Sequence, residues 1–206
     1  MCGIIGIISE EDVSSSIYES LTVIQHRGQD AAGMATLEDG KLHVRKQIGL
    51  VREVFRAQHI KNLKGKMGIG HVRYPTAGGV TREFSQPLYV NSPYGISICH
   101  NGNLVNSKEL TQELYENDLR HLNTDSDSEV ILNIFANEMQ KINSQSPSPE
   151  EIFSAVEKMH LRLKGAYSVV LMISGVGLLA IRDPNGIRPL MMGKKENDLL
   201  GKTDYM

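Results

Sequence analysis

Segments of strand length and amphipathic segments of helical length are grouped along this chain, and this grouping constrains the fold more than any other feature. Apolar or half-apolar runs predict strands at residues 3–8, in a hairpin over 33–47 centred on Asp39-Gly40, at 67–71 and at 95–100. The second half is more helical and ends with a hairpin around Ser174-Gly175. Without regular strand-helix alternation, the pattern favours an α+β fold of packed sheets covered by helices.

Helices are predicted where a capping residue precedes apolar residues at helical spacing. The predicted starts are Ser16 in the motif SIYE, Asn106 or Ser107, Ser126 with Glu129, and Ser148 with Glu151. The first of these helices is expected to end at Gly28. The stretch SQSPSPEE reads as a surface connection, RDPNGIRP as a turn, and the final dozen residues are polar and weakly patterned.

Composition restricts the class of partner. The 206 residues carry a formal net charge of −2, which does not suggest binding to nucleic acid or to a membrane surface. Apolar runs fall well short of the roughly 20 residues that span a bilayer, and the start lacks a secretory pattern, so we expect a cytoplasmic protein. Cys2 and Cys99 are too few for a disulfide framework, and the seven histidines lack metal-site spacing, so no metal is expected.

Cys2 lies at the head of the first predicted strand, where removal of Met1 would leave it with a free α-amine. An ordinary thiol, with a pKa of about 8.5, is mostly protonated at neutral pH and needs a base to become nucleophilic. The freed amine, with a pKa of about 7.7 to 8.0, is within reach of the sulfur of the same residue and can accept that proton. The alternative is an incidental small residue at the start of a strand.

Two further motifs follow predicted strands. Arg73 in HVRYPTAGG can bind a carboxylate through two parallel hydrogen bonds, and the alternative is a solvated loop arginine. Asn101 and Gly102 in HNGNL offer a side-chain amide and a backbone N–H of the kind that stabilise an oxyanion. Asn-Gly is also a turn signal, and spacing does not decide between the two interpretations.

The motif NTDSDSE places Asp125 and Asp127 at the start of a predicted helix. The helix dipole alone accounts for acids at this position, which is the structural alternative. As a functional residue, an aspartate here pairs with a substrate ammonium. One guanidinium for a carboxylate and one carboxylate for an ammonium together predict a pocket for a free amino acid.

Several motifs occur together in an order and spacing typical of one family. They are MCGIIGI, IQHRGQDAAG, GIGHVRYPTAG, NSPYGI, HNGNL, SDSE and RDPNGIRPL. Over nearly all of its length the chain resembles the N-terminal glutaminase domain of the amidophosphoribosyltransferases, within the class II glutamine amidotransferases. The resemblance implies an N-terminal nucleophile hydrolase sandwich, in which helices cover both outer faces of two packed, mainly antiparallel sheets (αββα).

The resemblance also implies catalytic roles. Cys2 would be the nucleophile and its freed amine the base, while Asn101 and Gly102 would form the oxyanion hole. The product would be a γ-glutamyl thioester on Cys2, released as glutamate by water after ammonia has left.

Substrate binding is implied in the same way. Arg73 would bind the α-carboxylate of glutamine, Asp127 would bind its α-ammonium, and Arg27 would support the site from a helix end. The loop from Arg73 to about Glu83 would close over bound glutamine.

The family's second domain, a phosphoribosyltransferase that requires magnesium, is not in the sequence. We therefore expect residues 1–206 to be one truncated glutaminase domain without a cofactor of its own. Its ammonia would serve that C-terminal domain in making 5-phosphoribosylamine, in the first step of de novo purine biosynthesis, and the full-length enzyme would be a homo-oligomer. Two alternatives are a glutamine-binding regulatory module without catalysis and a glutaminase that serves another acceptor.

Overall fold

The structure is a computed structural model that describes residues 1–74, 82–142, 144–197 and 202–206. Its strands are β1 (Gly3–Ile8), β2 (Ala31–Glu38), β3 (Lys41–Ile48), β4 (Met67–Arg73), β5 (Leu88–Val90), β6 (Ile96–Leu104), β7 (Gly165–Ile173), β8 (Gly177–Arg182), β9 (Lys194–Asn197) and β10 (Lys202–Tyr205). Its helices are α1 (Ser14–Val23), α2 (Val51–Val54), α3 (Ala57–Asn62), α4 (Ser107–Glu116), α5 (Asp127–Gln140) and α6 (Pro149–Arg162), with short 3₁₀ turns η1 (Gln25–Arg27) and η2 (Arg82–Phe84).

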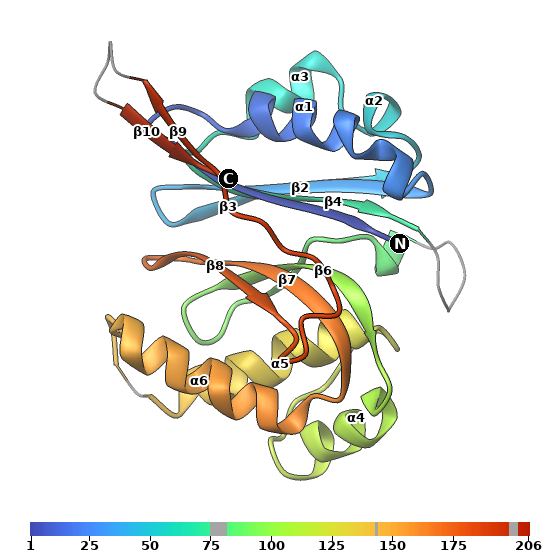
Figure 1. Ribbon diagram of the computed structural model, residues 1–206, viewed down its shortest axis with the longest axis vertical. Coiled ribbons are helices and arrows are strands. Elements are labelled where there is room, and N and C mark those ends of the chain that lie inside the picture. Colours follow the sequence, from blue (N-terminus) through green and yellow to red (C-terminus); the bar gives the residue numbers. More distant parts are fainter. Residues whose placement is uncertain (75–81, 143, 198–201) are drawn as a thin grey trace.

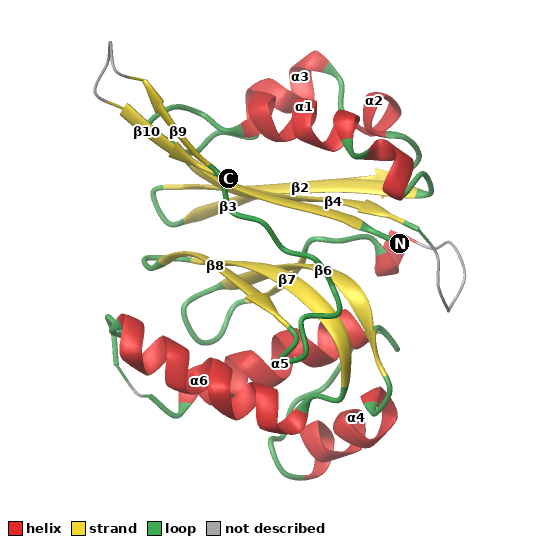
Figure 2. Cartoon of the chain, viewed as in Figure 1, coloured by secondary structure: helices red, strands yellow, loops and turns green. Residues whose placement is uncertain are grey.

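The strands form two sheets that pack face to face. One has six strands in the order β3-β2-β4-β1-β10-β9, and the other has four in the order β5-β6-β7-β8; the described pairs are antiparallel. Figure 1 shows α1, α2 and α3 over the outer face of the first sheet and α4, α5 and α6 beyond the outer face of the second. The layers in Figure 2 are helix, sheet, sheet and helix, which confirms the predicted αββα arrangement.

Three apolar layers hold the sandwich together, because each sheet buries both faces. The largest packs the four-stranded sheet against α4, α5 and α6, and a second packs the six-stranded sheet against α1, α2 and α3. The layer between the sheets is thin, with Ala35, Ile69, Cys99, Val170 and Met172 at its centre. A Cβ at Gly6 would lie 2.6 Å from Val170 Cγ1, so the close approach of the sheets requires glycine there.

Most predicted elements are confirmed, and the local chemistry explains two of them. The hairpin at Asp39-Gly40 has positive φ at both residues, as a tight two-residue turn requires. Helix α6 begins with the predicted reciprocal cap, in which Ser148 N donates to Glu151 Oε2 and Glu151 N to Ser148 Oγ.

Four local predictions were wrong or incomplete. Helix α1 begins at Ser14 without a side-chain cap, so Ser16 is an interior residue. Ser126 caps α5, but the Glu129 carboxylate turns back to Asn123 and Thr124 instead of closing the box. Helices α2 and α3 were not predicted. The polar, weakly patterned C-terminal residues form strands β9 and β10, which pair with each other at the sheet edge.

Candidate active site

A cavity of about 260 Å³ lies where β1 begins and β4 ends, and residues of both sheets and of α5 line it. Its lining includes Cys2, Arg73, Phe84, His100, Gly102 and Asp127. Two larger cavities of about 420 and 500 Å³ are lined by neither Cys2, Arg73 nor Asp127. The chemistry of the lining, not its volume, therefore marks the smaller cavity as the candidate active site.

The pairing of β1 with β4 brings the nucleophile and a cation together. Gly3 pairs with Val72, so Cys2, one residue before, lies beside Arg73 at the end of β4. The Cys2 side chain is half-buried, and its thiol donates to the Tyr74 carbonyl at 3.7 Å. The sulfur therefore faces the cavity and polar backbone, not packed hydrocarbon.

The thiol of Cys2 needs activation. Burial raises the pKa of the Cys2 thiol, because desolvation disfavours the thiolate. The amino terminus and the Arg73 guanidinium lower the pKa of this thiol, whereas the negative charge of Asp127 raises it, and the net pKa lies above the ordinary value. A thiol in this setting is a weak nucleophile until a nearby base takes its proton.

Arg73 is a buried residue of β4. Only 7% of its surface is exposed, and its guanidinium lies over the Phe84 ring at 5.2 Å from the centroid. The alternative of a solvated loop arginine is therefore wrong. The predicted lid behind it, from Arg73 to about Glu83, falls largely on residues 75–81, which lie outside the described residues.

Arg27 also reaches the nucleophile. It ends the 3₁₀ turn η1 that follows α1, and its Nε donates to the Cys2 carbonyl at 3.1 Å. This hydrogen bond holds the backbone of Cys2. The structure therefore places Arg27 beside the site, as expected. Its role in supporting substrate binding stays a prediction.

The motif HNGNL is strand, not turn. Strand β6 continues through Asn101 and Gly102 to Leu104, and these residues pair with β7 in register. Side chains alternate along a strand, so Asn101 shares the inner face with Cys99, toward the Cys2 sheet, while His100 faces α5. Gly102 lines the cavity, whereas buried Asn101 is not among its lining residues.

Glycine is required at position 102 by packing. A Cβ there would lie 2.2 Å from the Ala166 carbonyl oxygen, 2.6 Å from Tyr167 Cα and 2.7 Å from His100 Nε2. The strand can run this close to β7 and to the imidazole only without a side chain. The close approach fixes the position of the Gly102 peptide at the cavity wall.

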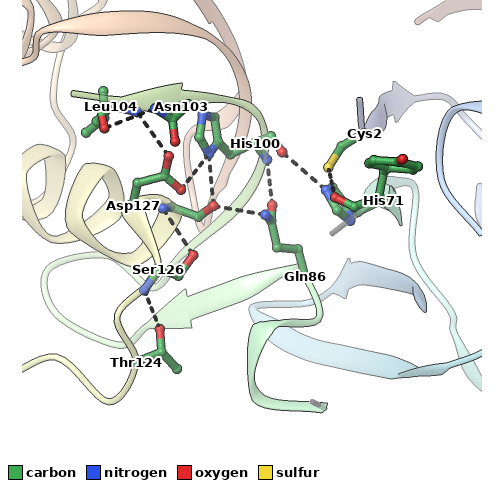
Figure 3. A network of polar contacts seen from close by, with 11 residues as sticks. Cys2, His71, Gln86, His100, Asn103, Leu104, Thr124, Ser126 and Asp127 are labelled. Carbon is green, nitrogen blue, oxygen red and sulfur yellow. Dashed lines mark hydrogen bonds and ion pairs between the residues drawn. The ribbon is translucent and has the colours of Figure 1, made fainter. Parts of the chain in front are cut away.

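Asp127 is the first residue of α5 and projects into the same cavity. Its Oδ2 accepts from Leu104 N at 3.1 Å, and its Oδ1 lies 3.6 Å from His100 Nδ1 (Figure 3). The side chain remains 21% exposed, so the carboxylate is anchored on one side and open on the other. Asp127 thus does more than complement the helix dipole. The structure brings it together with Cys2 and Arg73 as the sequence predicted.

Sequence reasoning missed three polar residues that support this wall: Gln86, His100 and Ser128. His100 N donates to Gln86 Oε1 at 2.6 Å, Gln86 Nε2 donates to Ser128 Oγ at 2.9 Å, and Ser128 Oγ lies 2.9 Å from His100 Nδ1. All three are buried. His100 and Ser128 lie within the recognised motifs HNGNL and SDSE, next to predicted site residues, but no spacing rule predicts that they contact each other.

His71 connects the two walls of the cavity. It is fully buried on β4, and its Nε2 donates to the His100 carbonyl at 3.2 Å. Burial lowers the pKa of His71 to about 3, because the imidazolium would lose its hydration, and the neighbouring Arg73 charge acts in the same direction. His71 is therefore a neutral donor that joins β4 to β6 across the sandwich.

Metal ligands are not clustered in the described parts of the chain. No group of three or more His, Cys, Asp or Glu residues there is placed to hold an ion. The described helices also include none that is long and apolar enough to cross a bilayer.

A family model matches this chain. Residues 79–201, more than half of the chain, match the model described as "Glutamine amidotransferase domain". The chain therefore belongs to the glutamine amidotransferase domain family, which is a family of enzymes.

Relatives in several organisms match over the whole chain. It is 54% identical to an amidophosphoribosyltransferase of Pseudomonas aeruginosa over 206 residues, 52% to one of Escherichia coli over 207, and 47% to one of Saccharomyces cerevisiae over 210. In each case the match covers 100% of this chain and 41% of the relative, so the chain spans less than half the length of these proteins.

Solved structures agree with the fold. The structure of the "allosteric regulatory enzyme of purine biosynthesis" superposes with a TM-score of 0.81 at 34% identity, over 100% of this chain and 41% of the other. Glutamine phosphoribosylpyrophosphate amidotransferase from B. subtilis, complexed with ADP and GMP, gives 0.79 at 32% identity with the same coverage. The N-terminal nucleophile hydrolase sandwich is thereby confirmed.

Proposed function

We propose that this domain hydrolyses glutamine to glutamate and ammonia through a covalent intermediate on Cys2. The observation that supports the proposal best is that a thiol, a buried guanidinium and an open carboxylate line one cavity of about 260 Å³. Opposite charges on its two sides match the two charged ends of a free amino acid.

Glutamine would lie between the two sheets. Arg73 would bind its α-carboxylate, and Asp127 its α-ammonium, through charge-assisted hydrogen bonds. The Leu104 N–H already occupies Asp127 Oδ2, which leaves Oδ1 for the substrate. With both ends bound, the side-chain amide would extend toward Cys2.

The reaction would then be acyl transfer. After removal of Met1, the freed α-amine of Cys2 would take the thiol proton, and the thiolate would attack the amide carbon. Asn101 and Gly102 would stabilise the tetrahedral oxyanion. The α-ammonium of Cys2 would then give its proton to the leaving nitrogen, which departs as ammonia when the C–N bond breaks. Water activated by the same amine would hydrolyse the γ-glutamyl thioester to glutamate.

Ammonia release from glutamine, measured on protein whose N-terminal residue has been established by mass spectrometry, tests this proposal. We expect release by protein that begins with Cys2, near-zero release by protein that retains Met1, and none by Cys2→Ala. Mass spectrometry of rapidly quenched reactions should detect the thioester. Saturable glutamine binding without ammonia release would instead support the regulatory module.

The relatives suggest the wider context. By analogy with the amidophosphoribosyltransferases, the ammonia would pass to a C-terminal phosphoribosyltransferase domain that makes 5-phosphoribosylamine with magnesium, in the cytoplasm and in a homo-oligomer. Sequencing of the gene beyond the codon for Met206 tests this part: a phosphoribosyl-pyrophosphate motif supports it, and a different domain would indicate another acceptor.

A further inference from the structure

Gln86, His100 and Ser128 form a closed ring of hydrogen bonds at the wall of the cavity. They come from three separate elements: the segment after η2, strand β6 and helix α5. Figure 3 labels Gln86 and His100. The three links, His100 N to Gln86 Oε1, Gln86 Nε2 to Ser128 Oγ and Ser128 Oγ to His100 Nδ1, measure 2.6, 2.9 and 2.9 Å. The ring therefore fixes the imidazole relative to two other elements.

The direction of each bond follows from its donors. The His100 backbone N–H can only donate, so the atom facing it is Gln86 Oε1, and the Gln86 amide nitrogen must face Ser128. Ser128 Oγ accepts from that nitrogen. Within the described residues its single hydrogen then has one acceptor, His100 Nδ1. Each member donates to the next, an arrangement in which hydrogen bonds strengthen one another.

This direction determines where His100 carries its proton. If Nδ1 accepts from Ser128, the neutral imidazole is protonated on Nε2, which is buried against Gly102 without a hydrogen-bond partner among the described residues. Nε2 has no partner among the described residues in either tautomer, but the reverse tautomer would also leave the Ser128 hydroxyl hydrogen without an acceptor there. It would also direct an N–H toward Asp127 Oδ1, which lies 3.6 Å from Nδ1.

We propose that Gln86 and Ser128 hold His100 as a positioning residue in the tautomer protonated on Nε2, so that Asp127 stays available to the glutamine ammonium. An Nδ1–H would place its positive partial charge 3.6 Å from Asp127 Oδ1 and compete electrostatically with the substrate ammonium for that oxygen. The Nε2 side packs against Gly102, so the same imidazole also supports the predicted oxyanion-hole residue. The effect on glutamine binding rests on the proposed glutamine hydrolysis, whereas the tautomer of His100 does not depend on that proposal.

The surroundings of His100 keep it neutral. The charged and titratable groups that face it are Asp127 on α5, Arg188 in the turn after β8, and His71 on β4. Burial lowers the pKa of His100 most, Asp127 opposes this, and Arg188 adds to it. A neutral ring forms no ion pair with Asp127, which leaves the charge of that carboxylate for a ligand.

Nitrogen NMR on the 206-residue protein with ¹⁵N-labelled histidine tests the tautomer directly. The His100 signals are assigned by their loss in His100→Asn. We expect a protonated Nε2 and an unprotonated Nδ1 at neutral pH. A proton on Nδ1, or an imidazolium, would overturn the proposal whatever the enzymatic activity is.

Steady-state kinetics of three variants test whether the tautomer of His100 affects glutamine binding. Ser128→Ala removes the hydroxyl that donates to Nδ1, and we expect His100 to move its proton to Nδ1 and KM for glutamine to rise about tenfold, with kcat within about twofold. Ser128→Thr keeps the hydroxyl and should restore both the tautomer and KM. Ser168→Ala removes an equally buried hydroxyl, which donates to the Pro189 carbonyl outside the ring, and should change neither.

The two parts of the inference can fail separately. Absence of ammonia release from the unsubstituted protein would reject glutamine hydrolysis and leave the NMR result standing. An active protein whose Ser128→Ala variant keeps the Nε2 proton and the original KM would reject the role of the ring. If Ser128→Ala does not fold, Gln86→Met, which breaks the other two links, replaces it.

Discussion

The two walls of the cavity are built in different ways. On the wall from the six-stranded sheet, the register of β1 against β4 places Cys2 beside Arg73, so backbone pairing sets the geometry. On the opposite wall, β6–β7 pairing places Gly102 and the Leu104 N–H anchors Asp127, but both residues also lie against the His100 side chain, which Gln86 and Ser128 hold in place. The first wall should therefore tolerate side-chain changes without loss of structure, whereas changes in the second should affect neighbouring residues.

The largest effect is expected at Cys2. Cys2→Ala should reduce ammonia release by a factor on the order of a thousand or more, because the covalent route is lost. The half-buried side chain contributes one weak contact, to the Tyr74 carbonyl, so the thermal midpoint should stay within about 2 °C. Calorimetry and an ammonia assay on the same preparation check both parts. A large fall in the midpoint would show that the first wall also depends on its side chains.

Gly102→Ala should give the next largest effect and should damage structure as well. A methyl group there would meet the Ala166 carbonyl, Tyr167 Cα and the His100 ring, so β6 must shift. Alanine keeps the backbone N–H, but the shift of β6 would move this donor away from the oxyanion. We therefore expect kcat to fall about 100-fold, with about 1–3 kcal/mol of destabilisation from overpacking. Urea unfolding measures the destabilisation, and steady-state kinetics measure the change in kcat. A variant with full activity would show that the added methyl group does not displace the Gly102 peptide from the cavity wall.

Asp127→Asn should mainly weaken substrate binding. The amide oxygen can still accept from Leu104 N, so α5 should keep its place while the negative charge is lost. Because hydrogen bonds between charged groups contribute about 1.5–3 kcal/mol, KM for glutamine should rise roughly 10- to 100-fold. The KM of Arg73→Lys, a substitution on the other wall, is measured for comparison. If Asp127→Asn leaves KM unchanged, the ammonium binds elsewhere.

Double-mutant cycles would measure the difference between the walls directly. Gln86→Met and Ser128→Ala remove partners in one ring, and we expect a coupling of about 1 kcal/mol in the free energy of unfolding. Ser128→Ala with Cys2→Ala crosses the cavity and should be additive within about 0.5 kcal/mol. Equal coupling energies in the two cycles would contradict the contrast between the walls.

The sequence predicted the first wall better than the second, for a physical reason. Strand and cap signals are local, so β1, β4 and α6 were predicted close to their observed positions, and Cys2 and Arg73 were expected near each other from the resemblance. Residues 51–62 lack a strong helical signal and were missed. Helix α2 is short and is held by contacts distant in sequence, such as Val51 N donating to Gln25 Oε1.

The polar ring was out of reach of sequence reasoning. Gln86 and His100 are 14 residues apart, and His100 and Ser128 are 28 apart, so their contacts exist only once β6 and α5 have packed. One local signal was available: strand alternation puts His100 and Gly102 on the same face of β6. This alternation applies only if HNGNL forms a strand. Because Asn-Gly also indicates a turn, the sequence did not establish the alternation.

At neutral pH the smallest expected effect concerns His71, which joins the two walls through its bond to the His100 carbonyl. The pKa of His71 is lowered to about 3 in the folded protein, and an unfolded histidine has a pKa of about 6.5. Between these values the unfolded state binds a proton that the folded state excludes. Stability is therefore complete above about pH 6.5 and falls with decreasing pH, by at most about 1.4 kcal/mol per pH unit from this residue.

His71→Gln tests this link, because the glutamine amide can replace Nε2–H as donor to the His100 carbonyl but does not titrate. Urea unfolding between pH 7 and pH 4 should show a shallower loss of stability in the variant, with similar stability at pH 7. His100, whose pKa is also lowered, keeps part of the slope in both proteins. Identical slopes would mean that His71 binds its proton equally in the folded and unfolded states between pH 7 and pH 4, which would contradict its role as a neutral donor over this range.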